Sequence, residues 1–260
     1  MLALLLAGLT CCAPETENGG RNTDKDAGSN RGQQATKEAT EPSTDDGAAA
    51  GPPHGADTWN YVALGDSLAE GVGAPRGYVD MYAEHLRQAT GARVELTNLG
   101  VSGQTSSQLL RAIRNNPSMR NSLRGAEVVT YNIGINDLGQ AWGYYDAETC
   151  GGAQDERCLH TAVRGLDENW NEITAEILSL TSDETIIRTA GLGYTPQAGR
   201  VAERYLRQVN HNIATSSDKN GIPYAEVGLG EKGLSSDGLH PNERGYRMIA
   251  DGLGDLGIRS

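Results

Sequence analysis

The sequence predicts an α/β fold, a three-layer α/β/α sandwich around a central, mostly parallel, five-stranded sheet. Short apolar runs alternate along the chain with longer segments whose apolar residues recur at helical spacing. Glycines close the first and third of these runs, at Gly65 and Gly134. Strands that alternate with helices build βαβ units and therefore a parallel sheet covered by helices on both faces.

The first strand is expected at 61–64, where Tyr-Val-Ala-Leu precedes Gly65. Four later apolar runs are the other expected strands, at 94–96, 128–133, 185–189 and 224–227. Apolar residues that step by three and four predict helices over 78–86, 159–180, 201–213 and 242–256. Ligands of such sheets bind beyond the carboxyl ends of the strands, so the residues after each strand are the candidates for function.

The first 58 residues are expected to lie outside this domain, which runs from 59 to 260. Residues 1–12, MLALLLAGLTCC, form a short apolar export segment, too short to span a bilayer. Around Cys12 it resembles the lipobox of bacterial lipoproteins, in which the cysteine becomes the lipid anchor, although Cys11 stands where Gly or Ala is usual. The alternatives are an ordinary secretory signal or a truncated start.

Residues 13–58 are predicted to be a disordered polar linker. They contain no Val, Ile, Leu, Met or aromatic residue, and they carry five Asp and four Glu against two Lys and two Arg. Such a segment cannot bury enough apolar surface to offset the entropy of ordering. A linker of this kind would let the domain stand off from a membrane surface.

The chain is acidic, with a formal net charge of −12. No basic stripe is present to replace the counterions of a phosphate backbone, so nucleic acid is excluded as a partner. We expect a monomer that touches a membrane only through its N-terminal anchor.

Polar residues follow the first three strands. Ser67 stands in Gly-Asp-Ser-Leu after the first strand, where its Oγ would be exposed at a strand-to-helix turn. A glycine loop with Gly100 and Gly103 follows the second strand, and Asn136 follows the third. Glycine lets a backbone N–H approach a ligand, and an Asn amide could donate to an oxyanion. Each feature alone is equally compatible with an ordinary turn or helix cap.

Asp237 and His240 stand three residues apart in Asp-Gly-Leu-His-Pro. On a tight turn the carboxylate can accept from the imidazole Nδ1–H, which leaves Nε2 free to act as a base. A surface pair or a metal pair would give the same spacing. No further ligand stands close by in sequence, so we expect no metal.

Together these motifs resemble the SGNH (GDSL-type) hydrolases, also known as lipase-esterases. The resemblance rests on Gly-Asp-Ser-Leu at 65–68, Gly103, Gly-x-Asn-Asp at 134–137 and Asp-x-x-His at 237–240, and it extends from 59 to 260. It also includes Gly-Tyr-Val-Asp at 77–80 and Pro-Asn-x-x-Gly-Tyr at 241–246. It implies a flavodoxin-like SGNH hydrolase fold and no cofactor.

The resemblance also implies roles. Ser67 would be the nucleophile of a catalytic triad, His240 its base and Asp237 the partner of His240. The oxyanion hole would be formed by the backbone N–H groups of Ser67 and Gly103 and by the side chain of Asn136, with Gly100 as an alternative to Gly103. Asp66 and Asp137 are expected to cap and brace their loops. The α/β-hydrolase nucleophile elbow, Gly-x-Ser-x-Gly, does not fit, because residue 69 is alanine.

Cys150 and Cys158 are the remaining cysteines. In an exported protein, two cysteines eight residues apart are expected to form a disulfide. Free thiols, or a zinc site that adds His160, are the alternatives.

The expected function is hydrolysis of a small-molecule, glycan or lipid ester through an acyl-enzyme, by an exported serine esterase. An acyltransferase or a carbohydrate acetylesterase would use the same site. A non-catalytic binding lipoprotein of the cell envelope is the alternative from another class.

Overall fold

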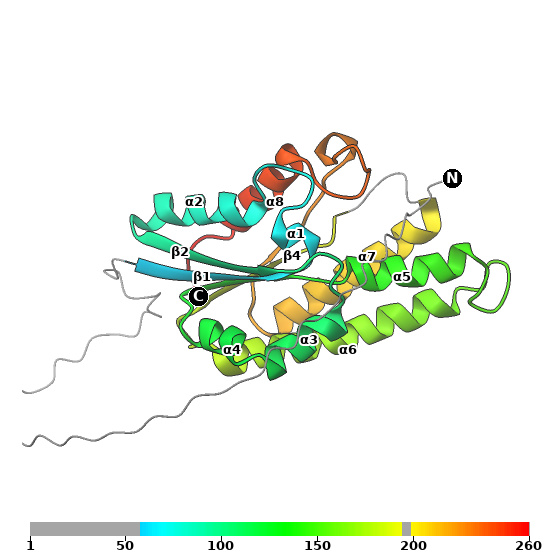
Figure 1. Ribbon diagram of the computed structural model, residues 1–260, viewed down its shortest axis with the longest axis horizontal. Helices are drawn as coiled ribbons and strands as arrows, with labels where there is room; N and C mark the ends of the chain where they lie inside the picture. Colours follow the sequence, from blue (N-terminus) through cyan, green and yellow to red (C-terminus); the bar gives the residue numbers. More distant parts are fainter. Residues whose placement is uncertain (1–57, 194–198, 260) are drawn as a thin grey trace, which may run out of the picture. The chain divides into compact units, whose positions relative to one another are not determined.

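A computed structural model describes residues 58–193 and 199–259. The predictions for the export segment, for Cys12 and for all but the last residue of the linker concern residues outside these ranges. Five parallel strands form one sheet in the order β2-β1-β3-β4-β5 (Figure 1). The strands are β1 Thr58–Gly65, β2 Arg93–Gly100, β3 Val128–Asn132, β4 Ile186–Ala190 and β5 Tyr224–Ala225. The predicted α/β class is confirmed, and the sheet is parallel throughout.

Helices cover both faces of the sheet, as Figure 1 shows. One face carries α1 Ser67–Glu70, α2 Tyr78–Thr90 and α8 Glu243–Asp255. The other face carries α3 Ser106–Asn115, α4 Pro117–Arg124, α5 Ile135–Asp146, α6 Arg157–Leu180 and α7 Gly199–Lys219. Each face has its own apolar core, because side chains of successive strand residues alternate between the two faces. In the described part of the chain, no helix is long and apolar enough to cross a membrane.

Burial explains why the central strands are continuous apolar runs. All five residues of β3 and all five of β4 are buried, as a strand covered on both faces requires. The edge strand β2 is largely exposed. The fifth strand is shorter than expected, since Glu226 and Val227 lie outside the two-residue β5.

A helix occupies the first part of the segment 138–158, for which the sequence predicts neither a helix nor a strand. Helix α5 begins at Ile135 and runs to Asp146, although it contains Gly139 and Gly143. Glycine weakens a helix interior, so the local signal is poor. Tertiary packing compensates, because Leu138 and Ala141 are buried in the core shared with α6.

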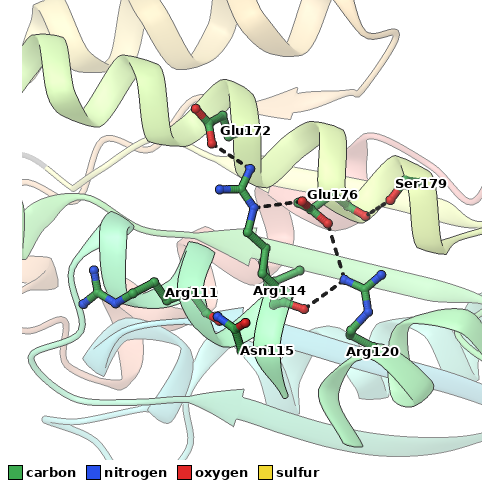
Figure 2. Close-up of polar contacts among 8 residues, drawn as sticks. Arg111, Arg114, Asn115, Arg120, Glu172, Glu176 and Ser179 are labelled. Atoms are coloured by element: carbon green, nitrogen blue, oxygen red, sulfur yellow. Dashed lines mark hydrogen bonds and ion pairs between the residues drawn. The ribbon is translucent and has the colours of Figure 1, made fainter. Parts of the chain in front are cut away.

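Surface ion pairs join α3 and α4 to α6 (Figure 2). Arg114 donates from Nε to Glu176 Oε1 at 2.9 Å and from Nη2 to Glu172 Oε2 at 2.7 Å. Arg120 reaches the other carboxylate oxygen of Glu176, at 3.4 Å. These side chains are partly exposed, so each pair contributes at most about 1 kcal/mol. The network is structural and includes none of the predicted site residues.

The strand register brings three loops to one line. Gly65 at the end of β1 pairs with Gly100 of β2 on one side and with Asn132 of β3 on the other. The segments that follow these strands therefore leave the carboxyl edge of the sheet side by side. They are the segments that contain Ser67, Gly103 and Asn136.

Candidate active site

Ser67 is the first residue of the one-turn helix α1, which directly follows the end of β1. Gly65 has a φ of +149°, and a Cβ there would collide with the carbonyl oxygen of Asn132, so a side chain is not tolerated. Asp66 then caps α1, and its Oδ1 accepts from Leu68 N at 3.0 Å. This places Ser67 at the helix N-terminus with 5% of its surface exposed.

The segment before α8 brings Asp237 and His240 to Ser67. The imidazole Nδ1–H of His240 donates to Asp237 Oδ2 at 2.6 Å, and its Nε2 accepts from Ser67 Oγ at 3.0 Å. This is the tautomer that the sequence argument requires. Three residues separated by up to 173 positions thus form one hydrogen-bonded chain.

The carboxylate of Asp237 is held in its ionised form. Burial alone would raise its pKa, but hydrogen bonds from His240, Ser235 and the backbone outweigh burial and hold the pKa well below its usual range. Oδ1 accepts from Ser235 Oγ at 2.7 Å, from Leu239 N at 2.8 Å and from His240 N at 2.9 Å. The negative charge faces Nδ1, where it stabilises an imidazolium.

Two residues outside the predicted set hold the segment 235–240 in position. Gly73, with a φ of +97°, lies so close to the segment that contains His240 that a Cβ on Gly73 would be 2.8 Å from Pro241 O and 2.9 Å from the His240 Cβ. Tyr246 is fully buried in α8, and its hydroxyl donates to Val72 O at 2.6 Å. The turn after α1 and the triad loop are therefore fixed to each other.

The glycine loop after β2 favours Gly103 over Gly100 as an oxyanion donor. The backbone N–H of Gly100 is already bonded to Asn98 Oδ1, at 3.0 Å. Gly103 has a φ of +76°, and its N–H has no acceptor among the residues that the structure describes. An N–H without an acceptor is available to a ligand.

Asn136 lies at the first turn of α5 and faces both other loops. Its Nδ2 donates to Gln104 O at 2.9 Å and to Asp66 Oδ2 at a longer 3.3 Å. The first bond holds the loop that contains Gly103. A substrate oxygen could replace the second, longer bond, to Asp66. The shorter bond to Gln104 O would meanwhile keep the Asn136 amide in place.

The buried carboxyl group of Asp66 and the half-buried one of Asp137 brace the site, as the sequence predicts. Burial raises the pKa of Asp66 to about 6. Burial also raises the pKa of Asp137, which accepts from Ser106 N at 2.9 Å and from Ser106 Oγ at 2.6 Å. Asp137 thereby ties the start of α5 to the start of α3.

Cys150 and Cys158 are joined by a disulfide, with their Cα atoms 5.4 Å apart. His160, the third ligand in the zinc alternative, instead has its Nε2 3.1 Å from the hydroxyl of Tyr205. In the described ranges, no group of three His, Cys, Asp or Glu side chains could hold a metal ion. The pair closes the connection between α5 and α6.

Sequence reasoning missed two residues that position the site, Gly73 and Tyr246. Tyr246 stands in the Pro-Asn-x-x-Gly-Tyr motif, which gave a signal without a role. Gly73 gave no signal, because its contacts join segments that are distant in sequence.

Comparison with known proteins identifies the family of the chain. The model of the GDSL-like Lipase/Acylhydrolase family matches residues 63–248. The chain is 27% identical over 208 residues to the spore germination lipase LipC of Bacillus licheniformis, and the alignment covers 75% of this chain and 95% of LipC. It is 28% identical over 207 residues to the uncharacterized protein YpmR of Bacillus subtilis, covering 73% and 77%.

Solved structures show the same fold. The lipase Lip_vut3 from a goat rumen metagenome superposes with a TM-score of 0.69 at 23% identity, covering 77% of this chain and 98% of the lipase. Axe2, an acetylxylan esterase from Geobacillus stearothermophilus, superposes with a TM-score of 0.60 at 18% identity, covering 77% and 95%. The chain therefore belongs to the GDSL-like lipase/acylhydrolase family, and it is a serine esterase of the SGNH type.

Proposed function

We propose that this protein is an exported carboxylic-ester hydrolase that works through an acyl-enzyme on Ser67. The observation that carries the proposal is the hydrogen-bonded chain from Ser67 Oγ through both nitrogens of His240 to Asp237, with links of 3.0 and 2.6 Å. Nucleophile, base and orienting carboxylate within hydrogen-bond reach are what acyl transfer requires.

In the first half-reaction, His240 Nε2 takes the proton of Ser67 as Oγ attacks the ester carbonyl carbon. The carbonyl oxygen becomes negatively charged and accepts hydrogen bonds from the N–H groups of Ser67 and Gly103 and from Asn136 Nδ2. The tetrahedral intermediate collapses, the bond to the alcohol oxygen breaks, and His240 passes its proton to the leaving alcohol.

In the second half-reaction, water takes the place of the alcohol. His240 removes a proton from water, the resulting oxygen nucleophile attacks the acyl carbon, and collapse returns the proton to Ser67 Oγ and releases the acid. Asp237 stabilises the imidazolium in both steps, which its strong hydrogen-bond support favours.

The substrates we propose are carboxylic esters with an alcohol part that is a small molecule, a glycan or a lipid. Carbohydrate acetyl esters are a second candidate class, favoured by the structural likeness to an acetylxylan esterase. Transfer of the acyl group to an alcohol acceptor would use the same intermediate.

We further propose that the chain is exported and anchored by a lipid on Cys12, with residues 13–58 as a tether. The apolar run that ends at Cys12 and the polar composition of the tether support this. The Cys150–Cys158 disulfide fits an oxidising compartment. Mass spectrometry of the mature N-terminus would detect a diacylated Cys12, and an unmodified Met1 would refute the anchor.

The test of the activity is hydrolysis of p-nitrophenyl esters from acetyl to palmitoyl, and of acetylated xylo-oligosaccharide, by the full chain. Ser67→Ala is expected to lose about 10³-fold or more in kcat/KM, as removal of a triad member does elsewhere. Ser179→Ala, on the exposed face of α6 in Figure 2, is the matched control and should keep wild-type activity.

The acyl pattern of the panel distinguishes the substrate classes. Preference for the acetylated oligosaccharide would favour the carbohydrate reading, and formation of a new ester with added alcohol would favour transfer. Equal rates for wild type and Ser67→Ala, or a fluorophosphonate label on another serine, would refute the proposed nucleophile. Absence of any turnover by wild type would favour a binding protein.

A further inference from the structure

We propose that Glu70 is a positioning residue of the oxyanion hole. Its carboxylate clamps Ser102 and thereby sets the direction of the neighbouring Gly103 N–H. The proposal rests on the function proposed above, because it concerns the group that would stabilise the oxyanion on the ester carbonyl.

The clamp consists of two hydrogen bonds to one oxygen. Glu70 Oε2 accepts from the backbone N–H of Ser102 at 2.8 Å and from its hydroxyl at 2.5 Å. Bonds to an ionised acceptor are stronger than bonds between neutral groups. The two bonds hold both the backbone and the side chain of Ser102, so the peptide that leads to Gly103 is restrained in rotation.

The clamp belongs to the same helical turn as the proposed nucleophile. Helix α1 begins at Ser67 and ends at Glu70, and the left-handed Gly71 closes it. A second bond runs from the same turn to the same loop, from Asn98 Nδ2 to Ala69 O at 2.7 Å. Helix α1 therefore fixes the position of both the Ser67 oxygen and the loop that contains the Gly103 N–H.

Close packing also holds the start of this loop against α1. A Cβ at Gly100 would lie 2.5 Å from Glu70 N, so the backbone of Gly100 rests directly on α1. Packing does not continue to Gly103, where a Cβ would meet no heavy atom within 4 Å. At Gly103 the loop is exposed, and hydrogen bonds are left to fix it.

The hydrogen bonds also determine which N–H is offered. The clamp occupies the N–H of Ser102, and Gln104 N donates back to Val101 O at 3.1 Å. Between them, the N–H of Gly103 has no acceptor among the described residues. On the far side, Asn136 holds Gln104 O, so the free donor lies between two fixed points.

The effect of losing the clamp follows from the geometry that an oxyanion donor requires. A displacement of about 1 Å can cost on the order of 10²-fold in rate, and complete loss of one donor costs about 10²–10³-fold. Glu70 is exposed, and water would replace part of its restraint. We therefore expect Glu70→Ala to lower kcat about 10- to 100-fold, with KM within about threefold of wild type.

A glutamine separates the hydrogen bonds from the charge. The carbonyl oxygen of Gln can accept from both donors of Ser102 without a negative charge beside the developing oxyanion. Glu70→Gln should therefore keep kcat within about threefold of wild type. Ser102→Ala retains the backbone N–H bond and should fall between wild type and Glu70→Ala.

The experiment measures kcat and KM on a p-nitrophenyl ester, together with inhibition by a trifluoromethyl ketone of the same acyl chain. This inhibitor forms an oxyanion on the serine, so its Ki should rise in Glu70→Ala by the factor by which kcat/KM falls. The matched control is Glu84→Ala on α2, an exposed glutamate whose hydrogen bonds within the described ranges go to Arg87 and Gln88 on its own helix. It should change neither quantity.

Wild-type kcat in Glu70→Ala would overturn the proposal, as would a loss in Glu70→Gln as large as that in Glu70→Ala. A rise in KM with unchanged kcat and Ki would also overturn it. Each result assumes that Ser67→Ala is inactive. An active Ser67→Ala would instead refute the proposed function, so the two failures are distinguishable.

Discussion

Asp66 makes the stability of this protein depend on pH in an unusual direction. Its carboxyl group is fully buried, and burial raises its pKa from an ordinary 3.8 to about 6. Replacement by Asn removes the titration while keeping the size of the side chain and an acceptor for Leu68 N. It also removes the acceptor of Asn136, at a cost that does not vary with pH.

The sign follows from proton binding. Between pH 4 and 6 the native state holds a proton on Asp66 that the unfolded chain has released, so the free energy of unfolding of wild type falls as pH rises. The gap of about two pH units corresponds to about 3 kcal/mol, at 1.36 kcal/mol per unit. Asp66→Asn lacks this decline. Part of this gap lies below pH 4, where the unfolded carboxyl group is still losing its proton, so the free energy of unfolding of Asp66→Asn should rise relative to wild type by about 2 kcal/mol from pH 4 to pH 7.

The assay is urea denaturation of both proteins at half-unit steps from pH 4 to 8. Asp237 acts outside this window, because its lowered pKa gives stability that is present above pH 3.8 and lost as pH falls further. Asp137 titrates in both proteins, and only its repulsion of the Asp66 carboxylate enters the difference. Ser179→Ala, which changes no titratable group, is the control and should give a constant difference. A constant difference for Asp66→Asn as well would refute the reasoning.

Three further predictions concern the supports of the site. Gly73→Ala should lower kcat about tenfold or more by displacing His240. The control is Gly91→Ala, whose added Cβ would meet no atom within 4 Å and which should alter stability alone. Equal kcat values for the two variants, measured on one ester, would contradict this prediction. Tyr246→Phe should lower the free energy of unfolding by about 1–2 kcal/mol, since the half-buried carbonyl of Val72 loses its donor, and an unchanged urea midpoint would argue against that bond. Cys158→Ser should lower the free energy of unfolding by about 2–3 kcal/mol; an unchanged melting temperature would contradict this prediction.

The sequence was sufficient to predict the sheet because burial leaves a direct mark on composition. The fully buried β3 and β4 are continuous apolar runs, and the register of a parallel sheet then brings the residues after Gly65 and Asn132 to one edge. Ser67 and His240 could be proposed because short motifs around them preserve local geometry.

The remaining features depend on contacts that no local pattern encodes. Glu70 matters because a loop 32 residues away folds onto it, and Gly73 because the triad loop approaches its Cα. Helix α5 was missed because Gly139 and Gly143 lower its intrinsic propensity while packing sustains it. Only tertiary structure distinguishes these positions from ordinary turn residues.

The 173-residue separation between Ser67 and His240 has a consequence for biosynthesis. At about 5–20 residues per second, a ribosome would deliver His240 roughly 10–30 s after Ser67. Throughout that interval the nascent chain carries the proposed nucleophile without its base, so it cannot cleave esters. Hydrolysis would begin only after α8 has docked and the Tyr246 hydroxyl has bonded Val72 O.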